Sequence, residues 1–117
     1  MRDPAILLPL TPVMFHLLLS LSDADRHGYA ILKEVSERTG GAVALSTGTL
    51  YGLIKRALAE GLIVESRRRP RADDDDERRR YYRLTEFGRQ VVTAEAERLE
   101  QLVASAWDKR VLRRSEG

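Results

Sequence analysis

The last third of the chain carries an apolar stripe that is too long for a domain of this size to cover. From Thr85 to about Arg114, apolar residues recur at steps of four and three, the spacing of one helix face, while Glu95, Arg98 and Glu100 are expected outside it. Such a helix would be ~45 Å long at ~1.5 Å per residue. A chain of 117 residues forms a single core, so the stripe predicts a homodimer. The expected dimer contacts are Val92, Ala96, Leu99, Leu102, Val103 and Ala106.

The beginning of the chain predicts a buried helix and not a membrane segment. Residues 5–21 are strongly apolar, but Pro9 and Pro12 interrupt the run well short of the ~20 residues that a membrane span requires. Thr11 can cap a helix that begins with Pro12 and ends near Ser22. Its apolar residues leave little polar face, so we expect a core helix in a cytoplasmic protein with no membrane partner.

A second, amphipathic helix follows a turn. Residues 22–28 (SDADRHG) are expected to form the turn, with His27 making local hydrogen bonds at the start of the helix. From Tyr29 onward the apolar residues Ile31, Leu32 and Val35 fall on one side. Gly40 and Gly41 should end the helix.

The segment from Ser46 to Ile63 carries the most information about function. Ser46 or Thr47 can cap a helix, and Gly61 supplies the left-handed residue that ends it. The expected inner face consists of Leu50, Ile54, Ala57 and Leu58. The opposite face combines hydroxyls, one aromatic ring and two cations: Thr47, Thr49, Tyr51, Gly52, Lys55 and Arg56. Hydroxyls and cations near a helix start are what a helix in a DNA major groove uses against bases and phosphates.

The next segment predicts a β-hairpin with a long, highly charged tip. Residues 62–66 (LIVES) and 78–84 (RRRYYRL) are β-rich, and Pro70 lies in the polar stretch between them. Between positions 67 and 83, eight Arg accompany five acidic residues. The arginines, above all Arg78, Arg79 and Arg80, can contact phosphates, or they can pair with the acids across the hairpin. The acidic run Asp73 to Asp76 is expected to be a solvated tip and not a metal site.

Composition and motifs argue against catalysis. The chain has no Cys, which excludes disulfides and thiolate metal sites, and its two histidines do not form a metal cluster. His16 lies in an apolar run and is expected in the core or at an interface. No nucleophile elbow or phosphate-binding glycine loop occurs. We therefore expect no enzyme activity, no cofactor and no metal. The net charge of +2 does not by itself indicate a DNA partner.

Together these elements predict a mainly α fold with a β-hairpin wing. We expect an N-terminal arm and winged helix-turn-helix domain over residues 1–84 and a long C-terminal dimerisation helix over 85–117, within one structural unit. The sequence resembles the PadR-type transcriptional regulators over about residues 11–89. The resemblance rests on HGY (27–29), GTLY (48–51), EGLI (60–63) and RRYYRLTEFGR (79–89). One departure is Ala57-Leu58, where the family commonly has Leu-Glu.

The resemblance implies a dimeric, ligand-responsive regulator, usually a repressor, that binds a palindromic operator in double-stranded DNA. The expected DNA contacts are Tyr29, Ser46, Thr47, Thr49, Tyr51, Lys55, Arg56, Arg78, Arg79 and Arg80. Trp107 can pack in a core or, with Val103 and Ala106, line a gap between subunits for a flat aromatic effector, as in some drug-binding relatives. The alternative function is a dimeric winged-helix module for protein–protein interaction without specific DNA binding.

Overall fold

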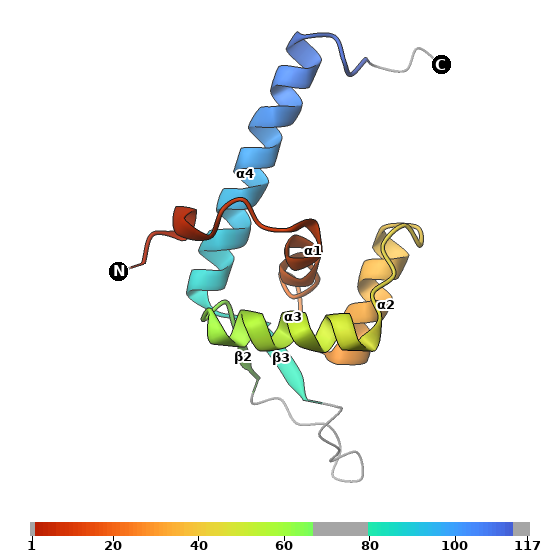
Figure 1. The fold of residues 1–117 in the computed structure, drawn as a ribbon, viewed down its shortest axis with the longest axis vertical. Coiled ribbons are helices and arrows are strands. Elements are labelled where there is room, and N and C mark those ends of the chain that lie inside the picture. Colours follow the sequence, from red (N-terminus) through yellow and green to blue (C-terminus); the bar gives the residue numbers. More distant parts are fainter. Residues whose placement is uncertain (1, 67–79, 114–117) are drawn as a thin grey trace.

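The computed structural model describes residues 2–66 and 80–113, and Figure 1 shows their arrangement. The elements in chain order are a 3-10 helix η1 (Pro4–Leu7), α1 (Pro12–Ser20), β1 (Arg26–His27), α2 (Gly28–Arg38), α3 (Thr47–Ala59), β2 (Ile63–Glu65), β3 (Tyr81–Leu84) and α4 (Glu86–Asp108). The predicted class, mainly helical with a small β-hairpin, is confirmed. In the described part of the chain, no helix combines the length and the apolar character that crossing a membrane requires.

Side-chain caps fix where the helices begin, as the sequence predicts. Thr11 Oγ1 accepts a hydrogen bond from the Met14 amide at the start of α1, and Pro12 is the first helical residue. Ser46 is the cap of α3, where Ser46 and Thr47 had both been possible. His27 Nδ1 accepts from the Ala30 amide, so His27 caps α2, which begins at Gly28, one residue earlier than expected.

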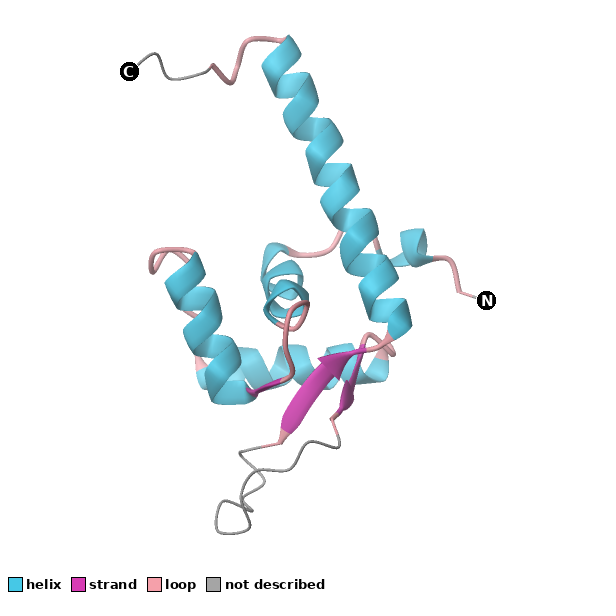
Figure 2. Ribbon diagram, turned by 180° about the vertical axis from the view of Figure 1, so that it is seen from behind, coloured by secondary structure: helices cyan, strands magenta, loops and turns pink. Residues whose placement is uncertain are grey.

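The wing is a three-stranded antiparallel sheet in the order β1-β3-β2 (Figure 2). The predicted hairpin is confirmed, with Ile63 opposite Leu84. The turn expected over 22–28 is wrong in part, because β1 pairs with β3 there. A strand of two residues shows no periodicity, so the sequence could not reveal it. The hairpin tip, with Asp73 to Asp76 and with Arg78 and Arg79, lies outside the described residues.

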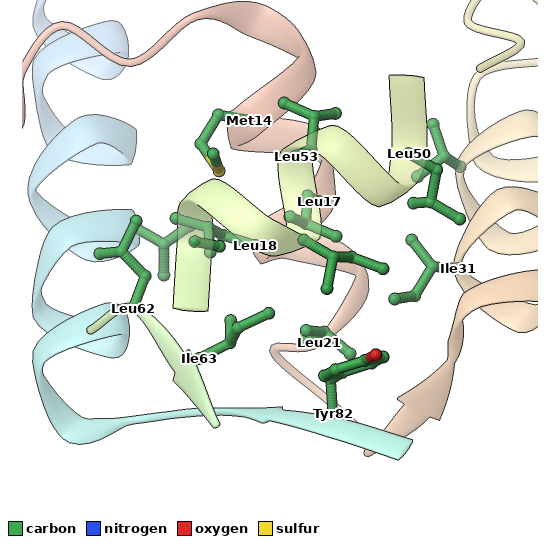
Figure 3. Packing of buried hydrophobic residues seen from close by; sticks show 14 of the residues in the cluster. Met14, Leu17, Leu18, Leu21, Ile31, Leu50, Leu53, Leu62, Ile63 and Tyr82 are labelled. Carbon is green, nitrogen blue, oxygen red and sulfur yellow. The ribbon is translucent and has the colours of Figure 1, made fainter. Parts of the chain in front are cut away.

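The core is centred on α1, as Figure 3 shows. Leu17 and Leu18 of this helix are fully buried among side chains from α2, α3, the wing and α4. One expectation for α3 is wrong: Leu58 is exposed, and Leu53 takes the inward position. Helical steps of three and four from Leu50 reach Leu53, Ile54 and Ala57, whereas Leu58 lies ~100° beyond Ala57. At Ala57-Leu58, where the chain differs from the proteins it resembles, Ala57 therefore faces the core and the bulkier Leu58 faces solvent.

α4 ends earlier than the stripe predicts, at Asp108 and not near Arg114. Arg110 adopts a left-handed φ of 60°, and the Val111 amide bonds back to the Ala106 carbonyl, which turns the chain away. The helix is therefore ~35 Å long. Its first half packs on the core, whereas its second half extends away from the rest of the chain (Figure 1).

Two residues of α4 differ in environment from what the stripe predicts. Val92, expected at the dimer contact, is buried in the core of its own chain. Glu95, expected outside the stripe, is buried with only 2% of its surface exposed. Leu102, Val103 and Trp107 in the second half are exposed, so the part of the stripe that is open to a partner begins beyond Glu95.

Candidate nucleic-acid interface

α3 runs crosswise below α1, away from the free end of α4 and above the wing strands (Figure 1). Its inner face packs on α1, α2 and β2, while every residue predicted for the outer face is exposed: Thr47, Thr49, Tyr51, Gly52, Lys55 and Arg56. No acidic residue occurs between Thr47 and Ala59. The outer face is therefore a cationic surface whose hydroxyls lie close to the positive end of the helix dipole.

Two hydroxyls at the start of α3 are already engaged with each other. Ser46 Oγ accepts from the Thr49 amide at 3.1 Å and donates to Thr49 Oγ1 at 2.9 Å. This pair holds the first turn of α3 in place. The Thr49 hydroxyl retains its own proton as a donor, and Thr47, the first helical residue, is exposed beside it.

Tyr51 links α3 to the start of α2. A Cβ atom added to Gly28 would lie 2.8 Å from the Tyr51 hydroxyl, so the end of the Tyr51 side chain packs against the backbone at Gly28 while 41% of the residue's surface stays exposed. Tyr51 therefore packs against the start of α2 and also faces solvent. Nearby in the chain, Tyr29 is 71% exposed in the first turn of α2. His27 caps that helix and packs edge-on against the Tyr81 ring, with the ring centroids 5.3 Å apart.

The base of the wing carries both paired and exposed cations. Arg80 Nε lies 3.7 Å from Glu65 Oε1, an exposed contact of the kind that contributes ~0–1 kcal/mol. This pair fits the alternative in which wing arginines meet acids across the hairpin. Arg83, which is not among the predicted DNA contacts, is exposed on β3 opposite Val64. Burial, followed by the charge of Glu65, raises the pKa of Tyr82 and keeps that phenol neutral.

His16 has a structural place between α1 and α2. It is partly buried, and Arg38 Nη1 lies 3.0 Å from its Nδ1 while Arg38 also pairs with Glu34. Burial, and then the Arg38 charge, lower the pKa of His16 and favour a neutral ring that can accept from the guanidinium. Among the residues that the structure describes, no three His, Cys, Asp or Glu side chains gather where they could hold a metal ion.

Comparison with known proteins identifies the family. The model of the transcriptional regulator PadR-like family matches residues 17–94, from α1 through the wing to the first half of α4. The chain belongs to the PadR family. PadR-like proteins are transcriptional regulators and not enzymes, and the winged-helix fold described above is theirs.

Individual relatives agree with this assignment. The chain is 34% identical over 90 residues to the transcriptional regulator Rv3488 of Mycobacterium tuberculosis, covering 77% of this chain and 78% of that protein. A transcriptional regulator from Clostridium thermocellum has a similar structure, with a TM-score of 0.66, 28% identity and coverage of 86% of this chain and 90% of its own. Bacillus subtilis PadR, solved in complex with operator DNA, shares the fold with a TM-score of 0.61 and 20% identity over 72% of this chain and 47% of that one.

Proposed function

We propose that this PadR-family regulator is a homodimeric repressor that binds a palindromic operator through α3 and releases it when an effector binds. The observation that carries the proposal is the outer face of α3, which presents hydroxyls, Lys55 and Arg56 to solvent in a helix without acids. The operator complex of Bacillus subtilis PadR supports DNA as the partner. A protein that acts on the chromosome is expected in the cytoplasm.

The geometry of α3 divides the expected contacts into two kinds. We expect Thr47 and Thr49 in the first turn to reach base edges, and Lys55 and Arg56, about two turns further on, to hold phosphates. Tyr29 and the wing arginines, of which Arg80 is described, would add backbone contacts. Ser46 contributes by fixing the start of α3.

The second half of α4 supports the dimer. Ala96, Leu102 and Val103 are exposed in the single chain, and Leu99 and Ala106 are only partly covered. A partner helix laid along this stripe would remove that surface from water, which is favourable by ~25 cal/mol per Å². Two α3 helices related by the dimer axis would enter successive major grooves, so we expect an inverted repeat with half-sites ~10 bp apart, or a multiple of that.

Lys55→Ala tests whether α3 is the helix that contacts DNA. We expect the variant to bind an operator duplex more weakly and, because one phosphate contact is lost, to reduce the slope of log affinity against log salt by about one unit. The affinity is measured by fluorescence anisotropy at several salt concentrations. Lys109→Ala makes the same change of charge at the far end of α4, and it should leave the affinity and the salt slope near their wild-type values. If the two variants have equal effects, or if neither has an effect, α3 does not contact DNA.

The alternative function, a dimeric module that binds protein, is favoured by the Arg80–Glu65 pair and by the low net charge. A gel shift at two salt concentrations separates the two functions. A shift that requires an inverted repeat supports the repressor, whereas weak, salt-sensitive binding to any DNA supports the module.

Trp107 is the side chain most suited to an effector. It is 44% exposed near the end of α4, beside Val103 and Ala106, and is not part of its own chain's core. We propose that Trp107 and its symmetry mate stack against a flat aromatic ligand. Titration with a planar cationic dye should quench the tryptophan fluorescence and release heat, and Trp107→Ala should abolish that heat. Unchanged fluorescence with no heat of binding would exclude this ligand class.

A further inference from the structure

The N-terminal arm, residues 2–10, contacts two helices, because η1 packs on α4 and Arg2 reaches the C-terminal end of α3. In Figure 1 the arm crosses α4 before it enters α1, and η1 packs directly on α4. α3 is the proposed DNA-reading helix, and α4 is the proposed dimer helix. An element that contacts both can influence how the two α3 helices of a dimer are presented to DNA.

Arg2 joins the end of α3 to the start of α4. Its Nη1 donates to the backbone carbonyl of Glu60, the C-cap residue of α3, at 2.7 Å, and its Nη2 lies 3.2 Å from Glu60 Oε2. The same guanidinium lies 4.6 Å from the ring centroid of Phe87, in the first turn of α4. A planar group held by a carbonyl, a carboxylate and a ring restricts orientation as well as distance.

The other end of the arm is anchored on α4 by a buried carboxylate. The Leu10 amide donates to Glu95 Oε2 at 3.0 Å, and Arg98 donates to both oxygens of the same carboxylate. These hydrogen bonds, first of all those from Arg98, hold the pKa of Glu95 below its ordinary value even though burial acts in the opposite direction. The arm is therefore fixed to α4 independently of Arg2.

Between these two anchors the arm does not pack tightly against α3. A partly open cavity of about 250 Å³ separates them, lined by Leu7 and Leu10 from the arm, Met14 from α1 and Arg56 and Glu60 near the end of α3. Among the described residues, the hydrogen bonds that cross from the arm to the end of α3 all come from Arg2. Removing the Arg2 side chain would take away the arm's hydrogen bonds to the end of α3 without opening the core, while the bonds from Thr85, the N-cap of α4, to the Gly61 and Leu62 carbonyls remain.

We propose that the arm is a strap that helps to set the orientation of α3 on α4, in addition to the hydrogen bonds from Thr85, with Arg2 as a positioning residue for DNA binding. The expected effect of Arg2 on DNA binding rests on the proposed function, whereas the effect of Arg2 on the orientation of α3 does not. The Arg2–Glu60 ion pair is exposed and contributes little to the free energy of unfolding. We therefore expect its effect in the affinity for an operator, which depends on how both α3 helices of the dimer are oriented. Arg2 lies at the opposite end of α3 from Thr47 and need not touch DNA itself.

Operator binding by Arg2→Ala tests the consequence. We expect about a five- to tenfold loss of affinity for an operator duplex, the size of an ordinary coupling between contacting groups, with the thermal midpoint and the salt slope close to wild type. Arg2→Lys keeps the charge but loses the planar contacts, and should also weaken binding. Glu60→Gln should weaken binding as well, and the double variant should be no weaker than Arg2→Ala alone.

A spin-label distance between α3 and α4 tests the geometry without DNA. The chain has no native cysteine, so Gly52→Cys on α3 and Gln101→Cys on α4, both exposed, can be labelled cleanly. Diluting the labelled chains into unlabelled protein leaves one labelled chain per dimer. We expect a narrow distance distribution that Arg2→Ala broadens or shifts.

The outcomes separate the strap from the proposed function. An unchanged distance distribution in Arg2→Ala overturns the strap, whatever the protein binds. A broadened distribution with unchanged affinity overturns the role of Arg2 in DNA binding. A salt slope lowered by about one unit, with equal weakening on unrelated DNA, makes Arg2 a phosphate contact instead. Failure of the wild-type protein to prefer any DNA sequence overturns the proposed function, while the distance measurement still decides the strap.

Discussion

Gly88→Ala should lower the free energy of unfolding by about 3 kcal/mol or more, at the upper end of the range for overpacked sites. A Cβ atom at this position would lie 1.9 Å from the carbonyl oxygen of Leu62, which is backbone and not the end of a flexible side chain. That carbonyl cannot withdraw easily, because it accepts from the Thr85 amide, and the Thr85 hydroxyl donates to the neighbouring Gly61 carbonyl at 2.6 Å. Thr85 in turn caps α4 through the Gly88 amide.

Urea unfolding measures this effect, with Gly52→Ala as the matched control. A Cβ at Gly52 meets nothing within 4 Å, so alanine there should stabilise α3 by up to ~1 kcal/mol through its helix propensity. Replacing glycine with alanine is thus expected to lower the free energy of unfolding in α4 and to raise it in α3. If Gly88→Ala unfolds at the wild-type urea concentration, α4 does not approach the Leu62 backbone as closely as the structure indicates.

Glu95→Gln should destabilise the protein by about 2 kcal/mol at neutral pH. Glutamine has nearly the shape of glutamate, but it replaces the charged acceptor of three hydrogen bonds, and bonds to charged groups contribute ~1.5–3 kcal/mol. Glu97→Gln, at an exposed position of the same helix, is the control and should stay within ~0.5 kcal/mol of wild type.

The effect of Glu95 also has a defined dependence on pH. Because its folded pKa is lowered, the unfolded chain binds the proton more readily, and the stability that Glu95 contributes is fully present above its unfolded pKa, near 4.5. That contribution is lost as the pH falls through the folded pKa. The difference in unfolding free energy between wild type and Glu95→Gln should therefore shrink as the pH is lowered from 7 to below 4.5. A difference that stays constant over this range would show that the Glu95 charge is not what anchors the arm.

Local signals in the sequence predicted much of the fold. The caps at Thr11 and Ser46, the left-handed Gly61 at the end of α3 and the pairing of β2 with β3 each depend on a few neighbouring residues. The outer face of α3 was also predictable, because helical periodicity alone decides which side chains share a face.

The features that the sequence did not predict depend on distant parts of the chain or on an unusual local backbone conformation. The sequence predicts Glu95 at the surface, but the fold brings the Leu10 amide and Arg98 to its carboxylate. The end of α4 was missed because Arg110 adopts a left-handed conformation without the usual glycine. The roles of Tyr51 and Arg2 depend on contacts with Gly28 and Glu60, which no periodicity in the sequence reveals.

The measurement that tests the central claim most directly is the affinity of the wild-type protein for a duplex selected from random DNA, compared with a scrambled duplex of the same composition. At physiological salt we expect the selected duplex to contain an inverted repeat and to bind at least ~10³-fold more tightly, the lower end for specific DNA-binding proteins. Equal affinity for the two duplexes, with the same steep dependence on salt, would contradict operator binding by α3.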